Sequence, residues 1–397
     1  MPKKLLTIII SAGIIILGTV SYFLFFNGGN GGQNSQNDEG FFSSFFPESS
    51  DKESAGGGGG EENFGLEQAE TQTPSGVLSQ ISDKAVVAPV FNPSTQKIQY
   101  FDKATGRLFE TETNGKNKNQ LTINTIPEIF EAFWSFDLKN AVLRYPENSN
   151  GFETLKTFLI TNLATSTEGV FLPTGVSAVS FSPAESKIFY LSDNDTSHGI
   201  IANTENQNRK EIINLPFKQG LVEWPQSDVI TALTRPTALA EGYFYKINPK
   251  TGALSKIIDG KGLTAVYSKK GEKTLYSLLD GENEIATRIY DNKDKTTITL
   301  GIKTFPEKCL FSKNSEDIIY CAVPDFLAAG DYPEAWYKGL VSFSDSLWQL
   351  DVKTGAAKLI LKNTGLDIIN IFTDASEEVF FFQNKKDGVL WRVELSK

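Results

Sequence analysis

Short apolar stretches alternate with polar turns along most of this chain, and one arrangement recurs. Residues 181–190 read FSPAESKIFY: an aromatic residue and a serine, then a polar turn, then an apolar run that ends in tyrosine. An apolar run of this length between turn residues is typical of a β-strand. Around this phrase the pattern predicts four consecutive strands, at residues 176–182, 186–193, 199–205 and 210–215.

The phrase returns with an almost constant period. Successive copies begin 43 to 47 residues apart, until a last interval of 61. A repeat of about 40–45 residues built of short strands is typical of one blade of a β-propeller. Each copy begins with an aromatic residue, and these are Phe91, Trp134, Phe181, Trp224, Tyr267, Phe311 and Phe372. We therefore predict an all-β fold, a seven-bladed β-propeller of four-stranded antiparallel blades, in which the repeated aromatic residues pack between blades.

A second motif, a turn, supports the repeat. It reads DKATG at 102–106, NPKTG at 248–252 and DVKTG at 351–355. The opening Asp or Asn can accept hydrogen bonds from the backbone of the turn, and the glycine supplies a positive φ. We expect an outer hairpin of blades one, four and six. The last copy has only three apolar strands after Phe372, so residues 76–82, GVLSQIS, are expected to supply its fourth strand and cover an exposed edge.

The phrase FSPAESKIFYLSD resembles the SPDG-type repeat of TolB-like propellers, which are relatives of the WD-repeat family. The resemblance covers Val77 to Lys397 and implies the propeller fold. This chain differs from the TolB-like pattern in that only Phe181, among the repeated aromatic residues, is followed by Ser-Pro. It also has no Gly-His or Trp-Asp pair of a true WD repeat. With an N-terminal anchor, the chain is similar to bacterial propeller proteins that are tethered to a membrane.

The first 26 residues read as a membrane anchor. Lys3 and Lys4 precede 22 uncharged residues, Leu5 to Phe26, which would span about 33 Å as a helix. A cleavable signal peptide is the alternative, but its apolar region is usually shorter and ends in small residues. The two lysines favour a cytoplasmic N-terminus. We therefore expect a single-pass protein of the cell membrane, one transmembrane helix with the propeller outside the cytoplasm.

Residues 27–75 read as a flexible, disordered linker between the anchor (1–26) and the propeller domain (76–397). They are rich in Gly, Ser, Asn and Glu and carry nine acidic residues against one lysine, a composition that cannot bury enough apolar area to fold. The cluster Phe41, Phe42, Phe45 and Phe46 breaks this pattern. It could enter a membrane interface, fill a groove of a partner, or have no role, and the sequence leaves these readings open.

The charge and composition exclude several functions. The net charge is −10, whereas nucleic-acid binding normally needs a basic face. His198 is the only histidine, so metal sites built on histidine and Ser-His-Asp triads have little support. No nucleophile elbow and no phosphate-binding loop occurs. We predict no catalytic residue, no metal and no cofactor, and we lean against an enzyme.

The long last interval places about 17 extra residues in the sixth blade, within Pro324 to Val341. Long loops on a rigid scaffold are often functional, and Trp and Tyr are enriched in binding hot spots. The alternative is that the loop only packs over the blade. The candidate binding residues are Asp331, Tyr332, Trp336, Tyr337 and Lys338.

Cys309 and Cys321 are the only cysteines, and they lie at equal distances from Ser315 at the centre of a predicted hairpin. Residues directly opposite each other in a hairpin are close enough for a disulfide. We favour a disulfide outside the cytoplasm over two free thiols in the core.

Three functions remain. We favour a protein-binding scaffold or assembly factor of the cell envelope, with an envelope or surface protein of unknown identity as its partner. The second is a surface carbohydrate-binding protein or adhesin, which predicts exposed aromatic residues lining a groove. The third is a glycosidase or lyase that uses Asp and Glu, which predicts two carboxyl groups converging in one pocket.

Overall fold

The computed structural model describes residues 63–64, 76–123, 125–149, 152–163, 168–282, 284–328 and 330–395 of the 397-residue chain. These ranges are almost entirely β-structure. Their helices are the short α2 (Glu334–Tyr337) and the 3-10 helix η3 (Pro306–Lys308). The all-β class predicted from the repeat is therefore confirmed.

The predicted localisation needs correction. In the part of the chain that the structure describes, no helix is long and apolar enough to cross a membrane. The predicted anchor, Leu5 to Phe26, and the phenylalanine cluster of residues 41–46 lie outside the described residues. A single-pass protein with its propeller outside the cytoplasm is therefore not retained as an interpretation.

Most sheets consist of four antiparallel strands that follow one another along the chain. Four of them are β6 (Glu131–Trp134), β7 (Ala141–Ser149), β8 (Phe152–Ile160) and β9 (Gly169–Phe171); β10 (Val176–Phe181), β11 (Lys187–Asp193), β12 (Ser197–Asn203) and β13 (Lys210–Leu215); β14 (Leu221–Gln226), β15 (Val229–Leu233), β16 (Glu241–Ile247) and β17 (Leu254–Lys261); and β22 (Cys309–Phe311), β23 (Ile318–Pro324), β24 (Asp345–Asp351) and β25 (Ala357–Leu361).

A fifth sheet has an additional parallel edge strand. It contains β18 (Thr264–Tyr267), β19 (Lys273–Leu279), β20 (Ile285–Asp291) and β21 (Thr297–Leu300), with β1 (Asn63–Phe64) beside β21. This contact falls within the range that the composition predicts as a linker.

The remaining sheet has seven strands and joins the two ends of the described chain. Its order is β26 (Ile368–Thr373), β27 (Val379–Asn384), β28 (Val389–Leu395), β2 (Gly76–Asn92), β3 (Lys97–Asp102), β4 (Leu108–Thr111) and β5 (Asn119–Gln120). The first part of β2 pairs with β28, from Gly76 opposite Leu395 to Ala85 opposite Val389. The second part pairs with β3. Residues 76–82 thus complete the last group of strands, as the pattern predicts.

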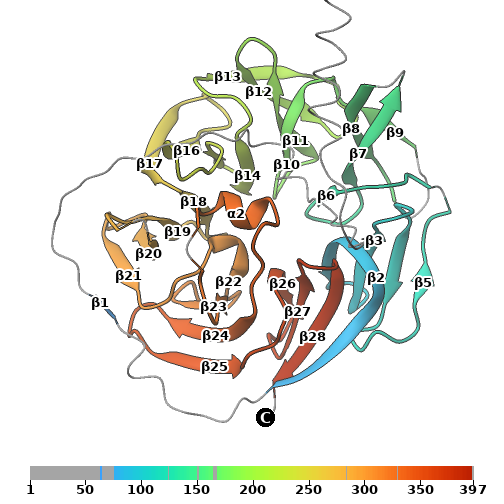
Figure 1. Cartoon of the computed structure of the whole chain (residues 1–397). Coiled ribbons are helices and arrows are strands. Elements are labelled where there is room, and N and C mark those ends of the chain that lie inside the picture. Colours follow the sequence, from blue (N-terminus) through green and yellow to red (C-terminus); the bar gives the residue numbers. More distant parts are fainter. Residues whose placement is uncertain are drawn as a thin grey trace, which may run out of the picture. The chain divides into compact units, whose positions relative to one another are not determined.

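Figure 1 shows these sheets arranged around a common centre, with the first strand of each group nearest to it. Apolar clusters join each sheet to its neighbour: Val179 and Ile188 pack with Val142 of the preceding sheet, for example. Val86 and Ile98 likewise pack with Phe381 of the last group. This arrangement is consistent with the blades of a propeller.

Six of the repeated aromatic residues lie in these apolar clusters: Trp134, Phe181, Trp224, Tyr267, Phe311 and Phe372. Phe91, Phe181, Trp224 and Tyr267 are less than 9% exposed, and the other three are partly buried. Their burial agrees with the interpretation that they pack between blades.

The predicted turn chemistry is present in all three copies. Asp102, Asn248 and Asp351 each accept a hydrogen bond from the backbone N–H three residues later, at 2.8–3.0 Å. The glycines that follow have φ between 65° and 76°. One placement was wrong: residues 102–106 connect the second and third strands of their group, whereas the other two turns connect the third and fourth.

Candidate functional site

The long insertion of the sixth group lies between β23 and β24 and carries α2. In Figure 1, α2 lies over the centre of the sheets. We call residues 325–344 the cap. The cap thus lies in the region where the first strands of the sheets converge.

The three aromatic residues predicted to bind a partner are buried in the base of the cap. Tyr332, Trp336 and Tyr337 are 4%, 2% and 4% exposed, and they pack with Phe305 and Phe343 in one apolar cluster. The Trp336 ring stacks on Phe305, with centroids 5.0 Å apart. These side chains pack the cap against the sheets, and a role of theirs in binding stays a prediction.

The two polar residues of the predicted set have a different environment. Asp331 is exposed and Lys338 is partly exposed, at the two ends of α2. A role of either side chain in binding therefore stays a prediction.

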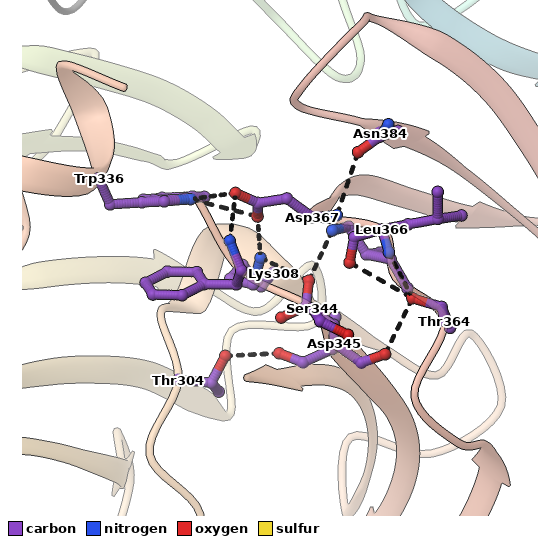
Figure 2. Close-up of polar contacts among 12 residues, drawn as sticks. Thr304, Lys308, Trp336, Ser344, Asp345, Thr364, Leu366, Asp367 and Asn384 are labelled. Carbon is purple, nitrogen blue, oxygen red and sulfur yellow. Dashed lines mark hydrogen bonds and ion pairs between the residues drawn. The ribbon is translucent and has the colours of Figure 1, made fainter. Parts of the chain in front are cut away.

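A fully buried group of charges lies beneath the cap. The Lys308 ammonium contacts Asp367 Oδ1 at 2.6 Å and Asp345 Oδ2 at 2.8 Å, and none of the three side chains is exposed (Figure 2). The residues come from η3 and from two segments that begin strands, far apart in the sequence. Burial raises the pKa of Asp345 to about 6, although the Lys308 ammonium acts in the opposite direction.

Asp367 connects these charges to the cap itself. Trp336 Nε1–H donates to both carboxylate oxygens of Asp367, at 3.2 and 3.0 Å, as Figure 2 shows. The backbone N–H of Phe343 donates to the same carboxylate at 3.1 Å. A buried carboxylate with this many partners holds the indole in a single orientation.

A carboxyl pair lies near the centre, below α2. Tyr337 Oη–H donates to Glu307 Oε1. Burial raises the pKa of Glu307, although the Tyr337 hydrogen bond lowers it. Glu223 lies on β14 between two buried residues, and its side chain is exposed on the other side of the strand. The protein groups around its carboxyl and then the Glu307 charge raise the pKa of Glu223 to about 7.

Large apolar side chains are exposed around the rim of the cap. Leu239, Phe326 and Leu340 are 58%, 77% and 75% exposed. Each adjoins an anchored residue: Ala238 donates its N–H to Glu334 of α2, while Leu327 and Val341 pack on the aromatic cluster. We call Leu239, Phe326 and Leu340 the cap surface.

The two cysteines lie opposite each other on β22 and β23, as their spacing predicts. The structure joins them by a disulfide, and Cys321 is fully buried. Cys309 begins β22 and directly follows Lys308, the last residue of η3, so the bridge lies next to the buried lysine.

In the described ranges, no group of three or more His, Cys, Asp or Glu side chains is arranged to hold a metal ion. His198 lies on β12, and its Nδ1 is 3.0 Å from Glu211 Oε1.

The sequence reasoning missed Lys308, Asp345, Asp367 and Glu223. Asp345 begins a strand and Asp367 precedes one, which is also where turn residues occur, so their position carries no distinct signal. Only the folded chain brings them together.

No family model and no curated protein matches this chain. Solved structures are similar to it. TolB from Acinetobacter baumannii is 14% identical to this chain, with a TM-score of 0.44. The match covers 68% of this chain and 61% of the TolB chain, so this chain spans less than two thirds of the length of TolB. An oligogalacturonate lyase from Vibrio parahaemolyticus is 10% identical over 80% of this chain and 93% of its own, with a TM-score of 0.57.

The β-propeller domain of Cps50 (Swd1) from Myceliophteria thermophila is also similar. It is 12% identical over 80% of this chain and 98% of its own, with a TM-score of 0.51. The lyase and the Swd1 domain support a β-propeller fold. At such low identity these likenesses concern the fold alone.

Proposed function

We propose that this chain is a protein-binding scaffold, a closed seven-bladed propeller that presents the cap surface to a partner protein. The observation that carries the proposal is the exposure of Leu239, Phe326 and Leu340 around a cap whose base is buried. Exposed large apolar side chains on an ordered base are found at protein interaction sites. Asp331 and Lys338 would supply part of the polar rim.

The rigidity of the cap supports this role. Trp336 is held by Asp367, and Glu334 is held by the backbone of Ala238. Because these contacts order the cap during folding, little further conformational entropy is lost when a partner binds.

The closed seven-bladed arrangement is itself part of the proposal. It is supported by the constant repeat, by the pairing of β2 with both β28 and β3, and by the apolar contacts between the first and last groups of strands. Closure would hold the cap at a constant position over the centre, since a propeller without free edges resists opening.

The test is chemical crosslinking with mass spectrometry in cells that make the full-length chain. A variant with Leu239→Ser, Phe326→Ser and Leu340→Ser should lose the crosslinked partner. A control with Val77→Ser and Phe136→Ser, which removes two apolar side chains that are 71% and 80% exposed elsewhere, should retain it. Recovery of the same partner from both variants, or of no protein from the unmodified chain, would contradict the proposal.

A second candidate is acid–base catalysis on a carbohydrate. The observation that favours it is the interaction of Glu223 with Glu307 near the centre, with a pKa of about 7 for Glu223. Glycosidases use two carboxyl groups, one of them kept protonated by its surroundings. Glu223 would be the acid and Glu307 the base.

This second candidate is tested by assaying the purified chain on a panel of polysaccharides between pH 5 and 8. Glu223→Gln and Glu307→Gln should each abolish product formation, whereas Glu185→Gln on an exposed turn should not. Absence of product from the unmodified chain on every substrate would remove this candidate.

A further inference from the structure

A cavity of about 410 Å³ lies between the sheet of β2–β5 and the sheet of β6–β9, away from the cap. It is bounded by Phe101 of β3, by the chain that follows β5, and by Tyr145, Phe158 and Phe171 of β7, β8 and β9. Its volume falls in the range of small-molecule binding sites, about 300–1,000 Å³.

The short strand β5 explains the cavity. β5 has two residues, whereas the fourth strands β9, β21, β25, β13 and β17 have three, four, five, six and eight. In a propeller, the outer strand of one blade covers the facing sheet of the next. Because the chain leaves the sheet after Gln120, part of the facing surface of β8 and β9 stays uncovered, and the cavity is the space that remains.

The position of one wall depends on a glycine. Gly106 has a φ of 65°, and a Cβ at this position would lie 2.2 Å from the carbonyl oxygen of Ile126. The backbone N–H of Ile126 donates to Thr105 at 2.9 Å. The recurring DKATG turn therefore brings the chain of Ile126 against the sheet and makes it one side of the cavity.

The lining is predominantly apolar. Phe101, Ile160 and Leu163 are at most 4% exposed and make the floor. Phe158 and Phe171 form a tilted ring pair with centroids 4.8 Å apart, and Phe171 is 57% exposed at the mouth. A ring that enters between these surfaces meets aromatic faces and edges, the geometry that aromatic contacts prefer.

The polar groups of the wall are already occupied. Thr122 Oγ1 accepts from the Leu108 N–H at 2.9 Å, and Thr125 Oγ1 accepts from Arg107 Nε at 3.2 Å. An apolar ligand would therefore leave no new unsatisfied group there. Tyr145 also lines the cavity, and burial raises the pKa of its hydroxyl, which stays protonated and can donate a hydrogen bond.

We propose that this cavity is a binding site for a small molecule with one or two apolar rings and a polar substituent. A cavity of about 150 Å³ holds one benzene ring, so the present volume accommodates one or two rings. The ring system lies between Phe158 and Ile126, and the substituent reaches the Tyr145 hydroxyl. This site is independent of the cap surface, so it stands or falls separately from the proposed scaffold function.

The test uses the full-length chain with indole and 2-naphthol as probes, by isothermal titration calorimetry and ligand-observed NMR. We expect saturable binding of at least one probe at a ratio of one per chain. Ile126→Trp should abolish it by filling the cavity, and Phe171→Ala should weaken it about tenfold by removing one ring contact.

Phe136→Ala, which truncates an 80% exposed phenylalanine elsewhere, serves as the matched control and should leave the dissociation constant unchanged. Circular dichroism and the melting temperature establish that each variant is folded, and Thr125→Trp replaces Ile126→Trp if the latter does not fold. Binding that survives both filling variants would overturn the proposal. The proposal would also be overturned if the chain bound a probe only after Phe41, Phe42, Phe45 and Phe46 were changed to Ser. That segment, and not a small molecule, would then be the occupant of the cavity.

Discussion

The backbone N–H of Ala238 donates a bifurcated hydrogen bond to both carboxylate oxygens of Glu334 on α2, at 2.8 and 3.0 Å, although the residues are 96 positions apart. The contact joins an insertion of one sheet to the loop between β15 and β16 of another. Glu334 is 6% exposed, so its carboxylate is paired and shielded from water. The cap is therefore held at both ends of α2 and not only by its own strands.

Glu334→Ala should destabilise the cap. A hydrogen bond to a charged group contributes about 1.5–3 kcal/mol, and its loss also leaves the Ala238 N–H without this partner. Hydrogen exchange at Ala238 and at α2 should become faster, with a lower free energy of unfolding in urea. Glu282→Ala, at an exposed position, is the control and should change neither. Unchanged exchange at Ala238 in Glu334→Ala would show that the contact does not hold the cap.

Lys308→Met should be among the most destabilising single substitutions. It leaves the Asp345 and Asp367 carboxyl groups buried without their shared ammonium, and breaking a buried ion pair typically costs about 3–5 kcal/mol. Urea denaturation of the purified chain measures this change.

The matched control for Lys308→Met is Lys303→Met, at a lysine five residues before Lys308. It removes an exposed ion pair between Lys303 and Glu284. Exposed pairs contribute about 0–1 kcal/mol, so this variant should unfold almost like the original chain. If the two substitutions cost the same, the buried charges do not stabilise the base of the cap.

The stability should fall as pH rises between about 5 and 7. Glu223 has its pKa raised from 4.5 to about 7, so the folded state binds the proton more strongly than the unfolded state in this window. The free energy of unfolding therefore decreases as pH rises through it. Asp345, raised from 3.8 to about 6, acts in the same direction at lower pH.

Glu223→Gln separates these contributions. The variant should show a smaller decrease in unfolding free energy between pH 6 and 7, where Asp345 contributes little. Urea denaturation at pH 5, 6, 7 and 8 measures the slope. A slope between pH 6 and 7 that is the same in both proteins would mean that Glu223 titrates near its ordinary pKa.

The disulfide should stabilise the sixth group of strands. It closes a loop with a sequence separation of 12. The lower entropy of the unfolded chain then stabilises the folded state by at most about 3 kcal/mol. We expect a Cys309→Ser, Cys321→Ser double variant to lose up to this amount. Alkylation followed by mass spectrometry should find no free thiol in the oxidised chain. A reductant should lower the melting temperature of the original chain and leave the double variant unchanged; two reactive thiols in the native chain would refute the bridge.

Local features were predictable because they depend on neighbours in sequence. The turn at 248–252 needs an Asn side chain and a glycine with positive φ, and both are present. The opposition of Cys309 and Cys321 follows from hairpin geometry and an even spacing. The candidate site was less predictable: the sequence left open whether Trp336 and Tyr337 bind a partner or pack over the blade, and their burial depends on Phe305 and Phe343, which the sequence did not single out.

The sequence by itself determined the repeat, the strands of each group and the pairing of residues 76–82 with the last strands, since strand pattern and turn chemistry act over a few residues. Only the tertiary structure decided that Lys308, Asp345 and Asp367 meet beneath the cap, that Glu223 lies near Glu307, and that a two-residue β5 leaves a cavity beside Phe158. The physical reason is that these contacts join segments far apart in the chain. Their distances depend on how the sheets pack around the centre, a property that no single stretch of sequence contains.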